Sequence, residues 1–183
     1  MNISDSRKNR LVNAYINAAK TYSNFVGYIF EIHTVEKIYK LEFNIKDFKH
    51  LCGIKSNLSD RDFYQNSFNG TLTINNINSS QPKDWNSLKG KERCLLNLNS
   101  LIETPTDTLF LEELDTGTCT FPVALRNDVQ DIAIAFKSNS NFYARSLRKA
   151  RHSLNCLKSS KIIKVYKISK NDNNDIKLIY ESY

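Results

Sequence analysis

The order in which two hydrophobic patterns follow one another constrains the fold of this chain more than any other feature of its sequence. Apolar residues recur at steps of three and four over residues 5–26, as they do along one face of a helix. After Pro105, six short runs alternate apolar and polar residues as strands do, with turn-prone "DTG", "SNSN" and "NDNND" between some of them. These runs are "TLFLEEL", "TCTFPVAL", "VQDIAIAFK", "NFYARSL", "KIIKVYKI" and "IKLIY". Helices followed by a mainly antiparallel sheet predict an α+β fold.

The segment between residues 27 and 104 contains both patterns. "GYIFEIHTV" and "KIYKLEFN" alternate and are separated by a short polar break, which predicts a β-hairpin. "DFKHLCG" predicts a short helix that ends at Gly53, because glycine readily adopts the left-handed closing conformation. We expect another helical turn over residues 59–68 and one helix over "DWNSLKGKERCLLNLNSLIE", which Pro105 follows.

The length and composition predict a single domain over residues 1–183, because 183 residues that are 40% hydrophobic can bury a sizeable core. No stretch reaches the roughly 18 to 20 continuous apolar residues of a membrane span, and residues 1–10 lack the apolar segment of a signal peptide. We therefore expect a cytoplasmic protein. The cysteines occur singly, without a CxxC pair or a histidine at zinc spacing, so we expect buried thiols, no metal and no cofactor. They are Cys52, Cys94, Cys119 and Cys156.

The net charge of +7 is concentrated in one part of the chain. Residues 132–170 contain ten Lys or Arg and no Asp or Glu, so the rest of the chain sums to −3, which is +7 less +10. A segment of one sign attracts a polyanion and gains affinity by releasing its counterions. We therefore favour contact with RNA or DNA over a basic face that only keeps the protein in solution. Aromatic residues such as Tyr143 lie among these charges, and both base stacking and core packing stay open for them.

A ribonuclease that works without metal needs a base for the ribose 2′-hydroxyl, an acid for the leaving oxygen, and cations for the phosphate. Histidine suits the first two roles, and the chain has three histidines. His33 lies between apolar neighbours in a strand-like run, where packing is the better interpretation. His50 lies in "FNIKDFKHLCGIK", at a predicted strand-to-helix corner beside Lys49 and Lys55. A polar side chain can be exposed there, so both a catalytic and a packing role stay open for His50.

The third histidine, His152, follows the basic stretch "ARSLRKAR". If this stretch is helical, its basic residues share a face with His152. If it is a strand, Arg145 and Ser146 point to opposite sides of the sheet. We predict a strand over residues 143–146 and a helix or loop over residues 147–157.

Several segments together resemble the phage-associated Barnase–EndoU–colicin–RelE-like nucleases. They are "YKLEFNIKDFKHLCGI", a helix around "GKERCLLNLNSL", and the β-rich "NFYARSL" and "KIIKVYKI". In that family an alternating strand is followed by an F-x-H-L-x-G step. This chain matches that step residue by residue, whereas its later segments match in character more than in residue identity. The residues that match this step are Phe48, His50, Leu51 and Gly53. The resemblance extends over roughly residues 27–180 and leaves residues 1–26 as an N-terminal helical extension.

The resemblance implies a ribonuclease-like α+β scaffold and RNA cleavage that is independent of metal. It suggests His50 as a catalytic residue, and Arg93, Arg145 and Ser146 lie by position where the family has polar site residues. Taken alone, Arg93 lies in the polar part of a helix, where a solvated charge is commoner than a phosphate clamp. A typical member has a polar terminal strand where this chain has a ladder of lysines, so the second catalytic partner stays open. We expect the RNA to contact Lys49, Lys55, Tyr143, Arg148, Lys149, Arg151, His152, Lys161 and Lys164.

A small basic nuclease of this length is also similar, in size and character, to anti-CRISPR proteins that truncate the guide RNA of a type II CRISPR effector. That similarity implies a protein of a mobile element, with the guide RNA and the effector nuclease as partners. A general RNA-cleaving toxin would use the same chemistry. In a different class, a non-catalytic basic module would block a nucleic-acid-binding partner, and His50 would only pack at a helix end. A DNA-binding regulator is less favoured, because no helix-turn-helix stands inside the basic stretch.

Overall fold

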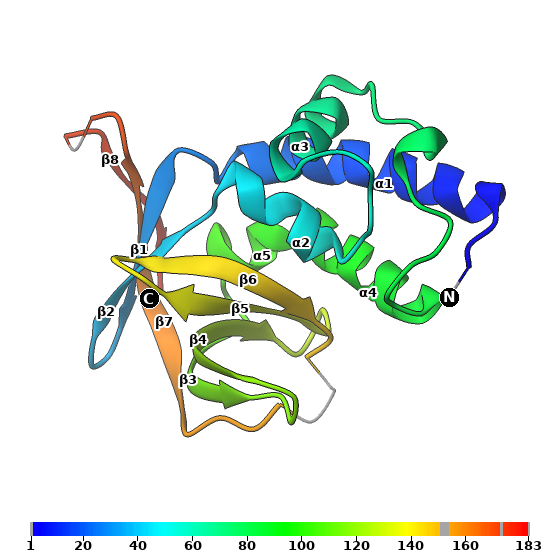
Figure 1. Ribbon diagram of the computed structural model, residues 1–183. Helices are drawn as coiled ribbons and strands as arrows, with labels where there is room; N and C mark the ends of the chain where they lie inside the picture. The colour runs from blue at the N-terminus through cyan, green and yellow to red at the C-terminus, as the bar shows by residue number, and fades with distance from the viewer. Residues whose placement is uncertain (1, 151–153, 173, 183) are drawn as a thin grey trace.

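A layer of helices packs against a β-barrel in the computed structural model, which describes residues 2–150, 154–172 and 174–182 (Figure 1). The helices are α1 (Asp5–Ser23), α2 (Phe48–Cys52), α3 (Asp60–Asn69), α4 (Trp85–Leu96) and α5 (Leu98–Ile102), with the 3-10 turns η1 (Ile45–Asp47) and η2 (Ile74–Asn76). The strands are β1 (Tyr28–Thr34), β2 (Ile38–Glu42), β3 (Thr108–Asp115), β4 (Thr120–Asn127), β5 (Ile132–Ser138), β6 (Phe142–Arg148), β7 (Lys158–Ser169) and β8 (Ile176–Glu181). The α+β class, the hairpin and the six later strands are confirmed. In the ranges that the structure describes, no helix is long and apolar enough to cross a bilayer.

The strands follow the order β1-β2-β6-β5-β4-β3-β7-β8, and a further pairing of β1 with β7 closes the first seven into a barrel. The pairs in the described part of the chain are antiparallel except that of β2 with β6, where Leu41 lies opposite Phe142. Closure is possible because β7 has 12 residues, which pair with β3 over its first part and with β1 and β8 over the rest. The sheet is mostly antiparallel as predicted, but this closed barrel corrects the expected ribonuclease-like sheet. Local alternation does not record which strands become neighbours.

An aromatic cluster joins the helices to the barrel. Tyr22 of α1 is fully buried, and its ring centroid lies 5.1 Å from that of Phe48 in α2 and 5.7 Å from that of Phe43, just after β2. The Tyr22 hydroxyl donates a hydrogen bond of 2.9 Å to the backbone oxygen of Asn44, in the connection from β2 to α2. Full burial of one such side chain contributes about 1.5–3 kcal/mol. The start of α2 is therefore held against both α1 and the barrel.

The single helix predicted over "DWNSLKGKERCLLNLNSLIE" is instead two helices, α4 and α5, which meet at Asn97. The Asn97 side chain donates through Nδ2 to the backbone oxygen of Arg93 at 2.8 Å, and its backbone has φ −114° and ψ 21°. A short amide side chain that bonds to the backbone competes with continued helix. Apolar periodicity gave no sign of this break, because the apolar face continues through it.

Strand β6 is longer than the strand predicted over residues 143–146. It continues to Arg148, because Leu147 and Arg148 lie opposite Ile134 and Ala133 of β5. The helix or loop predicted over residues 147–157 is therefore wrong at its first two residues. The alternative in which the basic residues share a helical face with His152 fails for the same reason over this part, while Arg151 and His152 themselves lie outside the described residues.

Candidate active site

His50 is the middle residue of the five-residue helix α2, at the predicted corner after the hairpin. Gly53 ends the helix with φ 68°, and its N–H donates to the backbone oxygen of His50 at 3.0 Å. The side chains of Phe48 and Leu51, on either side of His50 in this short helix, face the core and are fully buried. His50 is left exposed on the other side. The local sequence therefore fixes an exposed imidazole on a rigid turn.

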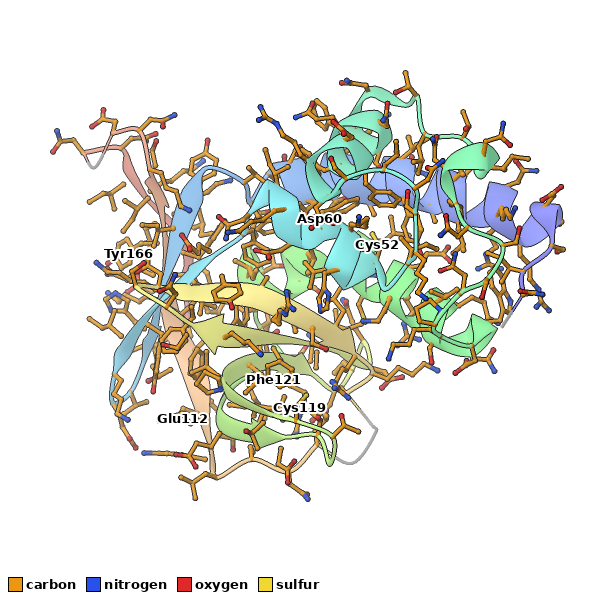
Figure 2. The ribbon with its side chains drawn as sticks, in the orientation of Figure 1. Cys52, Asp60, Glu112, Cys119, Phe121 and Tyr166 are labelled. Carbon is orange, nitrogen blue, oxygen red and sulfur yellow. The ribbon has the colours of Figure 1, made fainter. Side chains whose placement is uncertain are left out.

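Three neighbouring hollows line the seam between the helices and β6. The α2 hollow, of about 590 Å³, and the central hollow, of about 380 Å³, share Lys49, His50 and Arg145. The central hollow and the α4 hollow, of about 520 Å³, share Lys91, Ser146 and Arg148 among others. Figure 2 labels residues of both walls, Asp60 on the helical side and Cys119 and Phe121 on the barrel side. The three hollows form one continuous depression, which we name the basic groove.

Cations outnumber carboxylates two to one along the basic groove. The lining carboxylates are Glu42, Asp47, Asp60 and Asp84. The lining cations are Lys46, Lys49, Lys83, Lys91, Lys137, Arg145, Arg148 and Lys149. Some of this charge is already paired, since Lys49 Nζ lies 2.7 Å from Asp60 Oδ1. The groove as a whole favours an anionic ligand, and its length favours an extended one.

Partial burial and the surrounding charges set the protonation state of His50. Partial burial lowers the pKa of the His50 imidazole, and the positive charges of Arg145 and Lys91 lower it further. Asp60 acts in the opposite direction, but the pKa stays below the ordinary value of 6.5. At neutral pH the imidazole is therefore uncharged and able to accept a proton.

A β-bulge in β6 brings Arg145 and Ser146 to the same hollow. Ser146 lies opposite Ala135 of β5 and Ala144 lies opposite Phe136, so Arg145 is the extra residue with no partner in the register. A bulge reorients a side chain that regular alternation would send to the other face. Both residues consequently line the central hollow with His50, which corrects the expectation that a strand separates them.

The Arg145 guanidinium is free to bind an external anion. It makes no hydrogen bond or ion pair with another residue of the described ranges. Burial raises the pKa of the nearby Asp47 carboxyl, and the charge of Arg145 is one of several that only partly offset this rise. Tyr143, two residues earlier on the same strand, lines the α2 hollow beside it. Of the residues expected to contact RNA, Lys49, Tyr143, Arg148 and Lys149 therefore line the basic groove.

Arg93 does not join this group. One Nη2 atom of its guanidinium donates to the backbone oxygens of Gln130 and Asp131 and lies 3.3 Å from Asp131 Oδ2. It lines a further hollow with Arg10 and Lys89, which adjoins the α4 hollow through Asn86, Gly90 and Lys149 but shares no residue with the two hollows that His50 lines. Arg93 follows the groove-lining Lys91 by two residues in α4. Two residues correspond to a rotation of about 200° around the helix axis, so the two side chains leave α4 on nearly opposite sides.

Other expected site residues also lie away from His50. On β7, Lys164 Nζ is 2.7 Å from Glu181 Oε1, and neither it nor Lys161 lines a described hollow. Lys55 is exposed after α2, outside those hollows. His33 Nε2 lies 2.8 Å from Glu31 Oε1 on the same strand, which agrees with a structural role.

Lys91 is a groove residue that sequence reasoning missed. It is half-buried in α4, and its Nζ donates to the backbone oxygen of Leu147 at 3.1 Å. Burial is the main cause that lowers its pKa from 10.5 to about 8. A signal was present, because Lys91 follows Leu88 by three residues and precedes Leu95 by four, so it falls on the apolar stripe of the helix.

The cysteines differ in their surroundings. Cys52 and Cys94 are buried as expected, whereas Cys119 is exposed just before β4 and lines the central hollow. Its Sγ accepts from Arg148 Nη2 at 3.6 Å. Cys119 thus corrects the expectation of buried thiols, because the turn before β4 carries it to the surface. Over the described residues, no three His, Cys, Asp or Glu side chains are grouped so that they could hold a metal ion.

Comparison with protein families agrees with the resemblance that the histidine step suggested. The family model PBECR4, described as phage-Barnase-EndoU-ColicinE5/D-RelE like nuclease4, matches residues 16–183. The match confirms the suspected family and begins inside α1, earlier than the boundary expected at residue 27. A search of curated proteins found no match, and neither did a search of solved structures.

Proposed function

Because the chain belongs to the phage-Barnase-EndoU-ColicinE5/D-RelE like nuclease family, we propose that it is a metal-independent endoribonuclease that cleaves RNA in the basic groove. One observation carries the proposal: an exposed imidazole with a lowered pKa shares a hollow with a guanidinium that has no hydrogen-bond or ion-pair partner among the described residues. A reaction without metal needs a base for the 2′-hydroxyl and a cation that binds the phosphate, and these two side chains can supply them.

His50 acts as the general base. The neutral imidazole removes the proton of a ribose 2′-hydroxyl, and the 2′-oxygen forms a bond to the adjacent phosphorus. The bond from phosphorus to the 5′-oxygen breaks, and that oxygen takes up a proton. The products are a 2′,3′-cyclic phosphate and a 5′-hydroxyl, so the reaction consumes no water in this step. DNA lacks the 2′-hydroxyl and is not cut by this route.

Arg145 and Ser146 hold the reacting phosphate. A guanidinium donates to two phosphate oxygens at once and offsets the negative charge that develops as the phosphorus becomes five-coordinate. The Ser146 hydroxyl, which lines the same hollow, supplies a further donor. Electrostatic stabilisation of this kind is worth about 100- to 1,000-fold per donor in comparable sites.

The rest of the groove binds the strand on both sides of the cut. Its cations gain affinity by releasing counterions from the RNA backbone, and Tyr143 offers a ring on which a base can stack. We extend the proposal to the guide RNA of a type II CRISPR effector as substrate. The support for this narrower role is the small size and basic character of the chain, with a net charge of +7.

The test is a denaturing gel of labelled RNA incubated with purified protein in excess EDTA. Wild type should produce discrete fragments, and His50→Ala should be slower by about 100- to 10,000-fold, the usual contribution of general acid–base catalysis. Lys177→Ala, which removes an exposed lysine of β8, is the control and should cleave as wild type does.

The same gel separates the alternatives. Parallel lanes contain the guide RNA alone or bound to its type II effector, and cleavage of the bound guide supports the narrower role. Cleavage of unrelated RNA at the same rate points to a general ribonuclease. Intact RNA in every lane, together with stoichiometric inhibition of a nucleic-acid-binding partner, contradicts the enzyme and supports the non-catalytic binding module.

A further inference from the structure

The side chain of Lys91 packs against Gly53, the residue that ends the helix carrying His50. An added Cβ at Gly53 would lie only 2.5 Å from Lys91 Cδ and 2.7 Å from its Cε. The aliphatic part of Lys91 therefore occupies the space that the missing side chain of Gly53 leaves open. This contact fixes the direction in which the lysine leaves α4.

The ammonium group of Lys91 is consequently placed at the junction of two hollows. Within the residues that the structure describes, its Nζ donates one hydrogen bond, of 3.1 Å, to the backbone oxygen of Leu147, and Lys91 lines both the central hollow and the α4 hollow. Leu147 stands between Ser146 and Arg148, which line the same two hollows. An ammonium has three N–H groups, so two remain for a ligand at this junction.

We propose that Lys91 is the second catalytic residue, the general acid that protonates the leaving 5′-oxygen; this inference rests on the proposed function. An Nζ–H bond breaks and an O–H bond forms on the 5′-oxygen as the phosphorus–oxygen bond cleaves. Lys91 becomes a neutral amine and regains its proton from solvent, while His50 releases to solvent the proton that it took from the 2′-hydroxyl. One proton enters and one leaves, so no other reactant is required.

The charges that face Lys91 suit this role. Burial lowers its pKa to about 8, and the positive charges of Lys83 and Arg148 act in the same direction, while Cys94 and Cys52 oppose it. At neutral pH Lys91 is protonated and His50 is not, which are the states that an acid and a base require. The charged or titratable groups that line the central hollow with Lys91 are Lys49, His50, Lys83, Cys119, Lys137, Arg145 and Arg148, and Asp84 and Lys149 line the α4 hollow with it.

The decisive experiment compares two leaving groups in one variant. The linkage that wild type cuts is first mapped, and the same RNA is then made with sulfur in place of the bridging 5′-oxygen at that linkage. A thiolate leaves without being protonated, so the sulfur substrate needs no general acid. The main variant is Lys91→Arg, which keeps a positive charge but cannot release a proton near neutral pH, because a guanidinium stays protonated far above that range.

We expect Lys91→Arg to cleave ordinary RNA about 100-fold more slowly than wild type, or worse, and to cleave the sulfur substrate within a few-fold of the wild-type rate. Lys91→Met should show the same selective rescue, and Lys177→Met is the matched control. If a variant is less stable, the comparison of two substrates within that variant still isolates the leaving group.

The opposite results are equally clear. Equal losses on the two substrates would show that Lys91 only positions the helix or the phosphate, and a wild-type rate for Lys91→Arg on ordinary RNA would remove it from the mechanism. Either outcome overturns the inference and leaves the ribonuclease intact. Failure of wild type to cleave any RNA would instead overturn the proposed function itself.

Discussion

Arg145 and Ser146 are consecutive residues of one strand, yet their side chains line the same hollow. Regular alternation would send them to opposite faces of the barrel, and the bulge opposite Ala135 and Phe136 prevents this. The bulge therefore gives the proposed site two side chains that can donate hydrogen bonds to a phosphate, in the hollow that His50 also lines.

Arg145→Gln should slow RNA cleavage by about 100- to 1,000-fold, because it removes the guanidinium proposed to bind the reacting phosphate. It should also raise the pKa of His50, since the positive charge of Arg145 is one of the causes that lower it. Titration of the His50 ring protons by NMR measures the second effect. Lys177→Gln serves as the control and should leave both the rate and the titration unchanged. An unchanged His50 pKa in Arg145→Gln would show that the two side chains do not interact.

The rate of cleavage should stay high down to a pH below 6.5 and then fall. The pKa of His50 lies below 6.5, so acid protonates the base only beneath that value, and a protonated imidazole cannot accept the 2′-hydroxyl proton. On the alkaline side the rate should decline around pH 8, where Lys91 loses its proton. The measurement is kcat/KM against pH for wild type and Lys91→Arg. An acid limb centred above 6.5 is incompatible with His50 as the base.

Gly53→Ala should reduce both stability and cleavage, whereas Gly70→Ala should reduce only stability. Each glycine has a positive φ, 68° and 74°, so an alanine at either position costs about 1–2 kcal/mol of folding free energy. At Gly53 the added Cβ also meets the side chain of Lys91, while at Gly70 nothing lies within 4 Å. Denaturant unfolding and the RNA gel give the two readouts. If both variants cleave equally well, the position of Lys91 is irrelevant to catalysis.

Lys91 should make the protein more stable as the pH rises from about 8 toward 10.5, the ordinary lysine value. In that range the unfolded chain keeps a proton that the folded protein has released, so the free energy of unfolding increases with pH. Other groups titrate as well, and Lys91→Met isolates the contribution of this residue. The stability of wild type relative to Lys91→Met should improve between pH 7 and pH 10. A constant difference would mean that burial does not alter the titration of Lys91.

Affinity for a non-cleavable single-stranded RNA should fall steeply with salt. Each phosphate contact adds about 0.7 to the slope of log affinity against log salt concentration. Lys137→Ala and Arg148→Ala, which remove cations of the central hollow, should each reduce the slope by about that amount. Lys177→Ala, on the exposed strand β8, should not change it. Equal slopes for all four proteins would place the RNA on another surface.

The sequence by itself determined the succession of helices and strands, because periodicity and turn residues act over a few neighbouring positions. The hairpin, the short helix closed by Gly53 and the six later strands follow from such local patterns. The position of His50 at a strand-to-helix corner belongs with them, whereas the exposure of its side chain comes from the structure. The excess of positive charge between residues 132 and 170 was equally visible.

Only the tertiary structure decided which of these charged side chains lie together in one groove. The pairing of β1 with β7 closes the barrel, and the bulge brings Arg145 to the hollow that Ser146 lines. The rotation along α4 places Lys91 in the groove and Arg93 outside it. Each of these depends on contacts between residues far apart in the chain, which local periodicity does not encode. The sequence of a strand shows that apolar and polar residues alternate along it. Its register and its neighbours are set by the whole sheet and by the packing of the helices against that sheet.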